Sequence, residues 1–326
     1  MQTIQNLFAN RFALAVVVVV GVPLGLVGYI VLVEAIVSRL GRRAAARIRP
    51  WLWLGPALLF LGVFLLYPTI DTIIQSFKNS NGDAFVGLEN YHWFFTTGST
   101  LLALRNSVLW AVFLPALAVA LGLFVAVLAD RVKYERVVKT VIFLPMAISF
   151  VAAGVIWKLM YDIDPTTGTL NAVVHAVGQE PIGWLSSPTI NNFMLIFVGV
   201  WMLAGFAMVI LSAGLKGISV ELLEAARIDG CNEWQVFRKI SLPLLRPTTA
   251  VVATTAVIFA LKTFDIVYVM TSGNFNTEVI GYRMYKELFA YGNPGRSATA
   301  AVVLLLATVP VMLINVRRFR QNEAVR

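Results

Sequence analysis

The sequence contains very little of the chemistry that binds metal ions or forms disulfides. It has one cysteine, Cys231, and two histidines, His92 and His175, among 326 residues. A disulfide framework needs paired cysteines, and a zinc site needs several cysteine or histidine ligands. Neither a disulfide framework nor a zinc site can therefore be built from this chain.

Charged residues are also scarce. Only 13% of the residues are charged and 59% are hydrophobic, whereas an ordinary soluble domain is about half apolar and about a quarter charged. The net charge of +9 could suggest nucleic-acid binding, but the Lys and Arg residues fall in short clusters between long apolar runs. This arrangement predicts a membrane protein and gives no indication of nucleic-acid binding.

The motifs of ATP hydrolysis and of common hydrolytic enzymes are missing too. No Gly-Lys pair occurs, so the chain has no G-x-x-x-x-G-K-[ST] loop to hold phosphates. The H-E-x-x-H and G-x-S-x-G patterns are likewise absent from the sequence. We therefore expect a chain that is not by itself an enzyme, that carries no cofactor and that depends on another polypeptide for any ATP hydrolysis.

Long apolar runs dominate what is present. A helix needs about 20 apolar residues to cross the hydrocarbon layer of a bilayer, and seven segments satisfy this requirement. The predicted fold is thus all-α, with about seven transmembrane helices. The spans are 12–37, 51–74, 101–129, 137–161, 190–215, 244–271 and 297–316.

Basic residues give these spans an orientation, because cytoplasmic loops of membrane proteins are enriched in Lys and Arg. Every second connection is basic, namely 38–50, 130–136, 216–246 and the tail after 316, whereas the segment 162–188 has acidic residues and no Lys or Arg. The N-terminus is therefore predicted outside and the C-terminus in the cytoplasm.

The first span could alternatively be a cleaved secretory signal, since small residues follow at 44–46. Its apolar run is long for a signal, and its positive charges follow the run instead of preceding it. We therefore interpret residues 1–50 as a transmembrane anchor with a basic cytoplasmic linker, added to a six-helix core in residues 51–326.

The cytoplasmic loop 216–246 carries the most informative pattern. It is predicted to form two short helices around Gly230, which can take the left-handed conformation that ends a helix. Asn232 can cap the second helix, which presents Trp234, Phe237 and Ile240 before Pro243 stops it. Such an amphipathic element suits either a groove on a soluble partner or the bilayer surface, and periodicity alone does not separate the two.

A family resemblance separates them. Glu224-Ala225-Ala226, followed by Gly230 and then by Leu242-Pro243, resembles the EAA loop of the permeases of binding-protein-dependent ABC importers. The segments 85–91 (FVGLENY) and 264–273 (FDIVYVMTSG) resemble stretches of the carbohydrate branch, so the resemblance covers most of the chain from residue 51. One departure is Asn274-Phe275-Asn276, where that family usually has Gly-Gly-Pro.

The resemblance implies a function and a set of partners. In that family the EAA loop docks on the ATPase subunit, which assigns the contact here to Glu224, Ala225, Ala226, Asp229, Gly230 and Pro243. It also implies a second homologous permease, two ATPase subunits that bind ATP and magnesium, and an extracytoplasmic sugar-binding protein. The chain is then an inner-membrane sugar permease of a prokaryote that works by alternating access, with disaccharides or α-glucosides as expected substrates.

The family's layout further implies that the fifth and sixth spans line the sugar path. A sugar needs aromatic platforms and a few hydrogen-bonding groups in an apolar cavity. The positions that fit are Trp201, Phe206, Phe259, Lys262, Thr263 and Asp265. The alternative is that the aromatics only pack between helices, and that Lys262 and Asp265, three apart on one predicted helix face, form a structural ion pair.

Rival classes remain at this point. A seven-helix receptor or light-driven protein would share the topology, although the last span has no lysine to hold retinal. An ion-coupled carrier acting alone would need carboxylates within the membrane, and Asp265 is the one deep acidic residue. A permease for amino acids or phosphate is the nearest competitor within the importer class.

Overall fold

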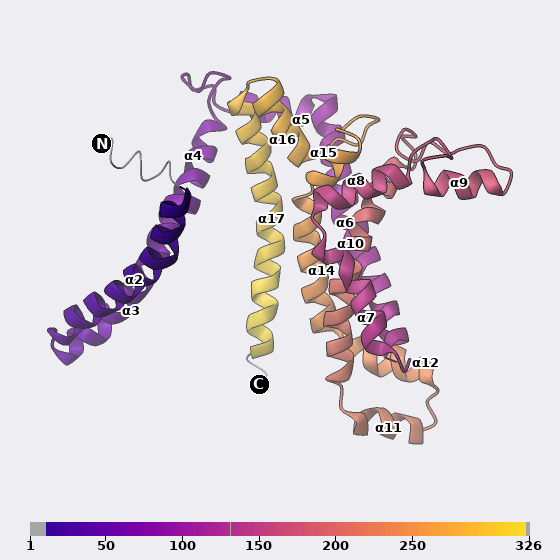
Figure 1. Ribbon diagram of the computed structural model, residues 1–326, viewed down its shortest axis with the longest axis horizontal. Coiled ribbons are helices and arrows are strands. Elements are labelled where there is room, and N and C mark those ends of the chain that lie inside the picture. The colour runs from indigo at the N-terminus through magenta and orange to yellow at the C-terminus, as the bar shows by residue number, and fades with distance from the viewer. Residues whose placement is uncertain (1–10, 131, 324–326) are drawn as a thin grey trace. The chain divides into compact units, whose positions relative to one another are not determined.

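The computed structural model describes residues 11–130 and 132–323, with side chains for 15–130 and 132–313. Within these ranges the regular elements are helices (Figure 1). The chain divides into two compact units, Met1–Asp71 and Thr72–Arg326. The predicted division after residue 50 falls inside a helix and stays a prediction. Arg131 and Arg326, two of the basic residues used for orientation, lie outside the described residues.

The first unit is a hairpin of two long apolar helices, α2 (Arg11–Ser38) and α3 (Arg42–Leu61). The pair is antiparallel, because the Arg49 guanidinium lies 2.6 Å from the Glu34 carboxylate and the Tyr29 hydroxyl donates to the Leu52 carbonyl. Most side chains on both helices are exposed, which is the expected state of helices whose solvent is lipid.

A π-helical turn, η1 (Gly62–Leu66), joins α3 to α4 (Tyr67–Gln75), which crosses the boundary between the two units. In this turn the Tyr67 N–H bonds the Gly62 carbonyl, five residues back. Proline has no N–H to donate and clashes with the carbonyl four residues before it. The wider turn therefore relieves the strain that Pro68 would impose on a continuous α-helix.

The second unit contains the remaining helices. Its longest are α6 (Gly98–Ala129), α10 (Asn191–Lys216), α14 (Arg246–Leu261) and α17 (Pro294–Glu323). Shorter elements are α5 (Glu89–Thr96), α7 (Glu135–Phe143), η2 (Leu144–Ala147), α8 (Phe150–Met160), α9 (Thr169–Ala176), α11 (Val220–Ile228), α12 (Glu233–Val236), η3 (Phe237–Ser241), α13 (Leu242–Leu244), α15 (Asp265–Met270), α16 (Ile280–Tyr285) and η4 (Lys286–Ala290). Figure 1 places α11 at one end of this unit and α15 and α16 at the other.

Five helices in the described residues are long and apolar enough to cross a membrane, and the number reaches seven if two bent helix pairs each form one span. This agrees with the predicted count of about seven. The orientation of the spans stays a prediction.

Two spans differ from the continuous helices that we predicted. The span 137–161 bends by 102° between Ala147 and Phe150, and the span 244–271 is interrupted between the end of α14 at Leu261 and the start of α15 at Asp265. In the first case Pro145 tightens the chain into the 3₁₀ turn η2, and Ser149 then caps α8 by accepting from the Ala152 N–H at 3.1 Å. A hydropathy window cannot detect such breaks, because both halves are apolar.

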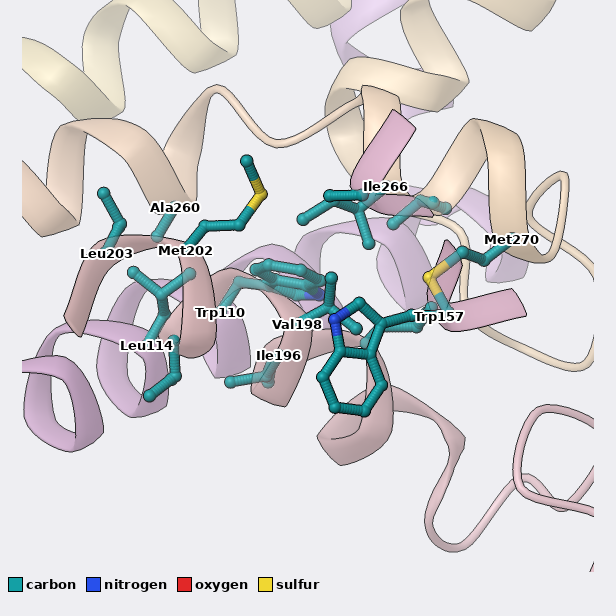
Figure 2. Packing of buried hydrophobic residues seen from close by; sticks show 14 of the residues in the cluster. Trp110, Leu114, Trp157, Ile196, Val198, Met202, Leu203, Ala260, Ile266 and Met270 are labelled. Carbon is teal, nitrogen blue, oxygen red and sulfur yellow. The ribbon is translucent and has the colours of Figure 1, made fainter. Parts of the chain in front are cut away.

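The core of the second unit forms where α6, α10, α8, α14 and α15 meet. Its buried side chains include Trp110, Leu114, Trp157, Val198 and Ile266 (Figure 2). At Gly122 a side-chain Cβ would lie only 2.5 Å from that of Ala207. Small residues thus allow α6 and α10 to approach closely, as helices in membranes commonly do.

Candidate functional site

The loop between α10 and α14 folds as the predicted pair of short helices. Ser219 caps α11, and Gly230 ends it with a positive φ of 84°. The Cys231 N–H bonds the Ala226 carbonyl and the Gly230 N–H bonds the Arg227 carbonyl, both at 3.0 Å. These two bonds are the Schellman arrangement, which requires the left-handed conformation that glycine adopts without strain.

The second short helix also starts as predicted but ends differently. Asn232 and Gln235 form a reciprocal capping box, each side chain accepting from the other's backbone N–H at 2.9 Å. The prediction that Pro243 stops this helix is wrong. The π turn η3 precedes Pro243, with the Leu242 N–H bonded to the Phe237 carbonyl, and the helix continues to Leu244.

We call α11, α12, η3 and α13, with their connecting residues, the loop element. Most of its predicted contact residues, namely Glu224, Ala225, Asp229 and Gly230, are exposed, but Ala226 is buried and Pro243 half-buried. Its apolar side chains Leu222, Ile228 and Trp234 are 44%, 86% and 65% exposed. A protruding surface of this kind is typical of a docking element.

An ion pair holds the two helices of the loop element together. The Arg227 guanidinium lies 2.7 Å from the Glu233 carboxylate, which raises the pKa of Arg227 above its ordinary value. Both side chains are about half exposed, so the pair sets geometry more than stability.

A cluster of charged side chains, missed in the sequence, lies beside the loop element. Lys139 on α7 lies 2.6 Å from Asp130 at the end of α6 and 2.6 Å from Glu135. The Ser212 hydroxyl on α10 donates to Asp130 at 2.9 Å, and Lys216 pairs with Glu135. We call these five residues the ionic cluster. It ties together three helix ends at the point where α10 leads into the loop element.

A cavity of about 230 Å³ opens where α6, α8, α10 and α14 meet. Four of the six predicted path residues line it, namely Phe259, Lys262, Thr263 and Asp265, together with Trp110, Phe150 and Phe264. Trp201 and Phe206 do not line it. Trp201 packs on Trp157, with ring centroids 5.5 Å apart, and Phe206 packs on a second buried cluster that includes Met208.

Lys262 and Asp265 do not lie on one helix face, so that part of the prediction is wrong. Lys262 is the C-cap residue that follows α14, Phe264 leaves the helical region with φ −142°, and Asp265 starts the separate helix α15. Within the described part of the chain no ion pair joins the two side chains. Both line the cavity instead, which gives it one cationic and one anionic group.

The wall of the cavity combines aromatic rings with hydrogen-bonding groups. Phe150 and Phe259 lie with ring centroids 5.2 Å apart. Trp110 is fully buried, and its indole N–H finds no acceptor among the described residues. Trp110 lies on α6, outside the fifth and sixth spans that the family's layout implied for the sugar path. An apolar cavity with a few convergent polar groups is the usual form of a small-molecule site.

This fold and these sites define a class, a polytopic helical membrane protein with a protruding loop element. The family described as binding-protein-dependent transport system inner membrane component matches residues 118–319. The chain is 51% identical to the osmoprotective compounds uptake permease protein GgtC of a Synechocystis species, over 84% of this chain and all of that protein. It is 46% identical to the alpha-glucoside transport system permease protein AglF of Rhizobium meliloti, over 87% of this chain and 85% of that protein.

A solved structure shares the fold. A chain of a bacterial ABC transporter involved in the import of the acidic polysaccharide alginate superposes with a TM-score of 0.74 at 21% identity, covering 86% of this chain and 99% of that one. The chain thus belongs to the family of binding-protein-dependent transport system inner membrane components. It is a transport component and a multi-pass protein of the cytoplasmic membrane.

Proposed function

We propose that this chain is the permease subunit of an ATP-driven, binding-protein-dependent importer that moves a sugar, in particular a disaccharide or an α-glucoside, into the cell. The observation that carries the proposal is the cavity, whose aromatic rings can lie against the apolar faces of a sugar while Lys262, Thr263 and Asp265 bond its hydroxyls. The similarity to AglF, a permease protein of alpha-glucoside transport, and to GgtC, a permease protein for uptake of osmoprotective compounds, supports this substrate class.

The path includes Phe259, Lys262, Thr263 and Asp265 in its wall. Trp201 and Phe206 lie outside the cavity wall and position it indirectly, because they pack on the two buried clusters and fix the position of α10. Trp110, Phe150 and Phe264 extend the predicted set.

The loop element is the proposed contact with the ATPase. Exposed Glu224, Ala225, Asp229 and Gly230 would face the partner together with Ile228. Buried Ala226 fixes the position of α11, and Pro243 sets the π turn that leads into α14. The role of these residues is therefore divided between contact and positioning.

The proposed complex holds this chain, a second homologous permease, two ATPase subunits and an extracytoplasmic sugar-binding protein. ATP and magnesium are bound by the ATPase subunits, and this chain carries no cofactor in the proposal. Closure of the ATPase dimer would move the loop element and, through the ionic cluster and α14, change which side of the membrane the cavity faces.

The test is uptake of radiolabelled maltose and sucrose into proteoliposomes that hold the whole complex, with and without ATP and the binding protein. We compare the native chain with Glu224→Lys, and use Glu180→Lys as a control because Glu180 is an exposed carboxylate outside the loop element. We expect ATP-dependent uptake that Glu224→Lys lowers and Glu180→Lys does not.

Three outcomes would contradict the proposal in different ways. Uptake without ATP or an ATPase would indicate an ion-coupled carrier. ATP-driven uptake of amino acids or phosphate but of neither sugar would place the chain among importers of another solute. Equal uptake by Glu224→Lys and the native chain would remove the ATPase contact from α11.

A further inference from the structure

Five aromatic side chains form a continuous chain of ring contacts on α15, α16, η4 and the turn before α15. They are Phe264, Tyr268, Tyr282, Tyr285 and Phe289. The ring centroid of Phe289 lies 5.0 Å from that of Tyr285, which in turn lies 5.4 Å from Phe264 and 5.3 Å from Tyr268. Phe264 and Tyr268 are stacked at 5.3 Å. We call this set the aromatic track.

The aromatic track leads from the surface into the cavity. Phe264 lines the cavity, whereas Phe289 at the other end of the track is 71% exposed. The elements that carry the track, α15 and α16, lie at the end of the second unit opposite α11 (Figure 1). If α11 contacts the cytoplasmic ATPase, as proposed above, the exposed end of the track faces the side from which a sugar arrives.

The backbone around the track is built to hold the rings in place. Gly281 of α16 packs on the Thr263 carbonyl, where a Cβ would lie 2.9 Å from the oxygen. Gly273 has a φ of 69° and lies against the Tyr282 ring, which a Cβ would approach to 2.5 Å. Larger residues at either position would push the rings apart, so the local sequence fixes the contacts of Phe264 and Tyr282.

The exposure and chemistry of the rings suit a ligand more than a core. Tyr282 is nearly buried, but Tyr268 is 41% exposed and Phe264 and Tyr285 are half-buried. A membrane-interface belt lies at one level of a helix bundle, whereas these rings continue into a cavity. Exposed ring faces with phenol hydroxyls offer both of the contacts that a sugar needs, apolar surface and hydrogen bonds.

We propose that the aromatic track binds sugar at the outer end of the permease and guides it, ring by ring, into the cavity. The proposal rests on the proposed function and deepens it, because it assigns substrate contacts to residues beyond the cavity wall.

The experiment uses the whole complex in proteoliposomes, with saturating binding protein loaded with maltose or sucrose. Sugar uptake and ATP hydrolysis are measured together for Tyr268→Leu, Tyr285→Leu and Phe289→Leu. The ring-preserving variants Tyr268→Phe and Tyr285→Phe test whether the ring itself is needed. Phe193→Leu is the matched control, because Phe193 is 41% exposed on α10 and makes an edge-to-face contact with Phe113 outside the track.

We expect each Leu variant to lower uptake by about five- to tenfold, the factor that loss of one aromatic contact typically represents. ATP hydrolysis should fall much less, so that more ATP is used per sugar. The Phe variants, which keep the ring and lose only the hydroxyl, should retain more uptake than the Leu variants, and Phe193→Leu should behave like the native chain.

Two results would overturn the track alone. The first is unchanged uptake in the Leu variants. The second is that the Leu variants lose uptake and ATP hydrolysis to the same extent and no longer bind the second permease, which would show that the rings form a subunit interface. If the native complex takes up neither sugar, the proposed function fails and the track fails with it.

Discussion

Gly230 offers the sharpest test of how the loop element works. Its φ of 84° lies in the left-handed region, and a side chain placed there would meet no atom within 4 Å. The effect of a substitution is therefore conformational and not steric. For most L-residues the left-handed conformation costs about 1–2 kcal/mol, whereas asparagine tolerates it. Proline cannot adopt it and also removes the N–H that bonds the Arg227 carbonyl.

These costs predict an ordered series for ATP-driven uptake. Uptake by Gly230→Asn should stay close to that of the native chain. Uptake by Gly230→Ala should fall by up to about tenfold, since about 1.4 kcal/mol is a factor of ten in an equilibrium. Gly230→Pro should lose nearly all uptake. Because Gly230 is exposed and its surroundings are open, the amount of protein inserted in the membrane should not change.

The assay is sugar uptake into proteoliposomes together with co-purification of the ATPase subunits. Gly178→Ala is the matched control, since Gly178 has a φ of 77°, equally open surroundings and the same pair of backbone bonds at the end of α9. A flat series, or an equal loss in the Gly178 variant, would refute the link between the left-handed turn and coupling.

Two further predictions concern charged side chains. Lys139→Met should lower the free energy of unfolding by about 1–2 kcal/mol, because Asp130 and Glu135 lose the lysine that they share in a partly buried site. The control is Lys133→Met, which removes a lysine from the same connection between α6 and α7. Equal thermal midpoints for the two variants would contradict the structural role of the ionic cluster. Burial raises the pKa of Glu287 above its ordinary 4.5 despite the nearby Arg283. A raised folded pKa contributes stability that is complete below the unfolded pKa and is lost as pH rises through the folded value, so the thermal midpoint of the native chain should fall over that window. Glu287→Gln should flatten this dependence, and an unchanged slope would show that other groups cause it.

The sequence was sufficient for the features that depend on composition or on local backbone chemistry. The apolar runs predicted the class and about the right number of spans, because the thickness of the bilayer imposes their length. Gly230 and Asn232 were assigned correctly, since a left-handed helix end and a helix cap each depend on one residue and its near neighbours. The motif at Glu224 led to the family that the comparisons then showed.

The features that depend on packing between distant segments were out of reach. The breaks at Pro145 and after Lys262 lie within apolar runs, and only the folded chain shows where each helix bends. The ionic cluster joins the adjoining ends of α6 and α7 to the end of the distant helix α10, with Asp130 and Ser212 82 positions apart. Trp110 reaches the cavity from α6 because of how the helices pack, which no single-helix pattern encodes.

The π turns before Pro68 and Pro243 have a consequence for how insertions and deletions affect this chain. A π turn holds one residue more than the α-helical turn it replaces. Deleting one residue within 237–241 would therefore leave an ordinary α-helical turn, with the surfaces of α12 and α13 in nearly the same relative direction, but it would bring Pro243 against the carbonyl four residues before it. Deleting one residue from a regular α-helical turn would instead rotate everything beyond it by about 100°. The segment 237–241 is thus a place where the chain length can change by one residue while Trp234 keeps its direction.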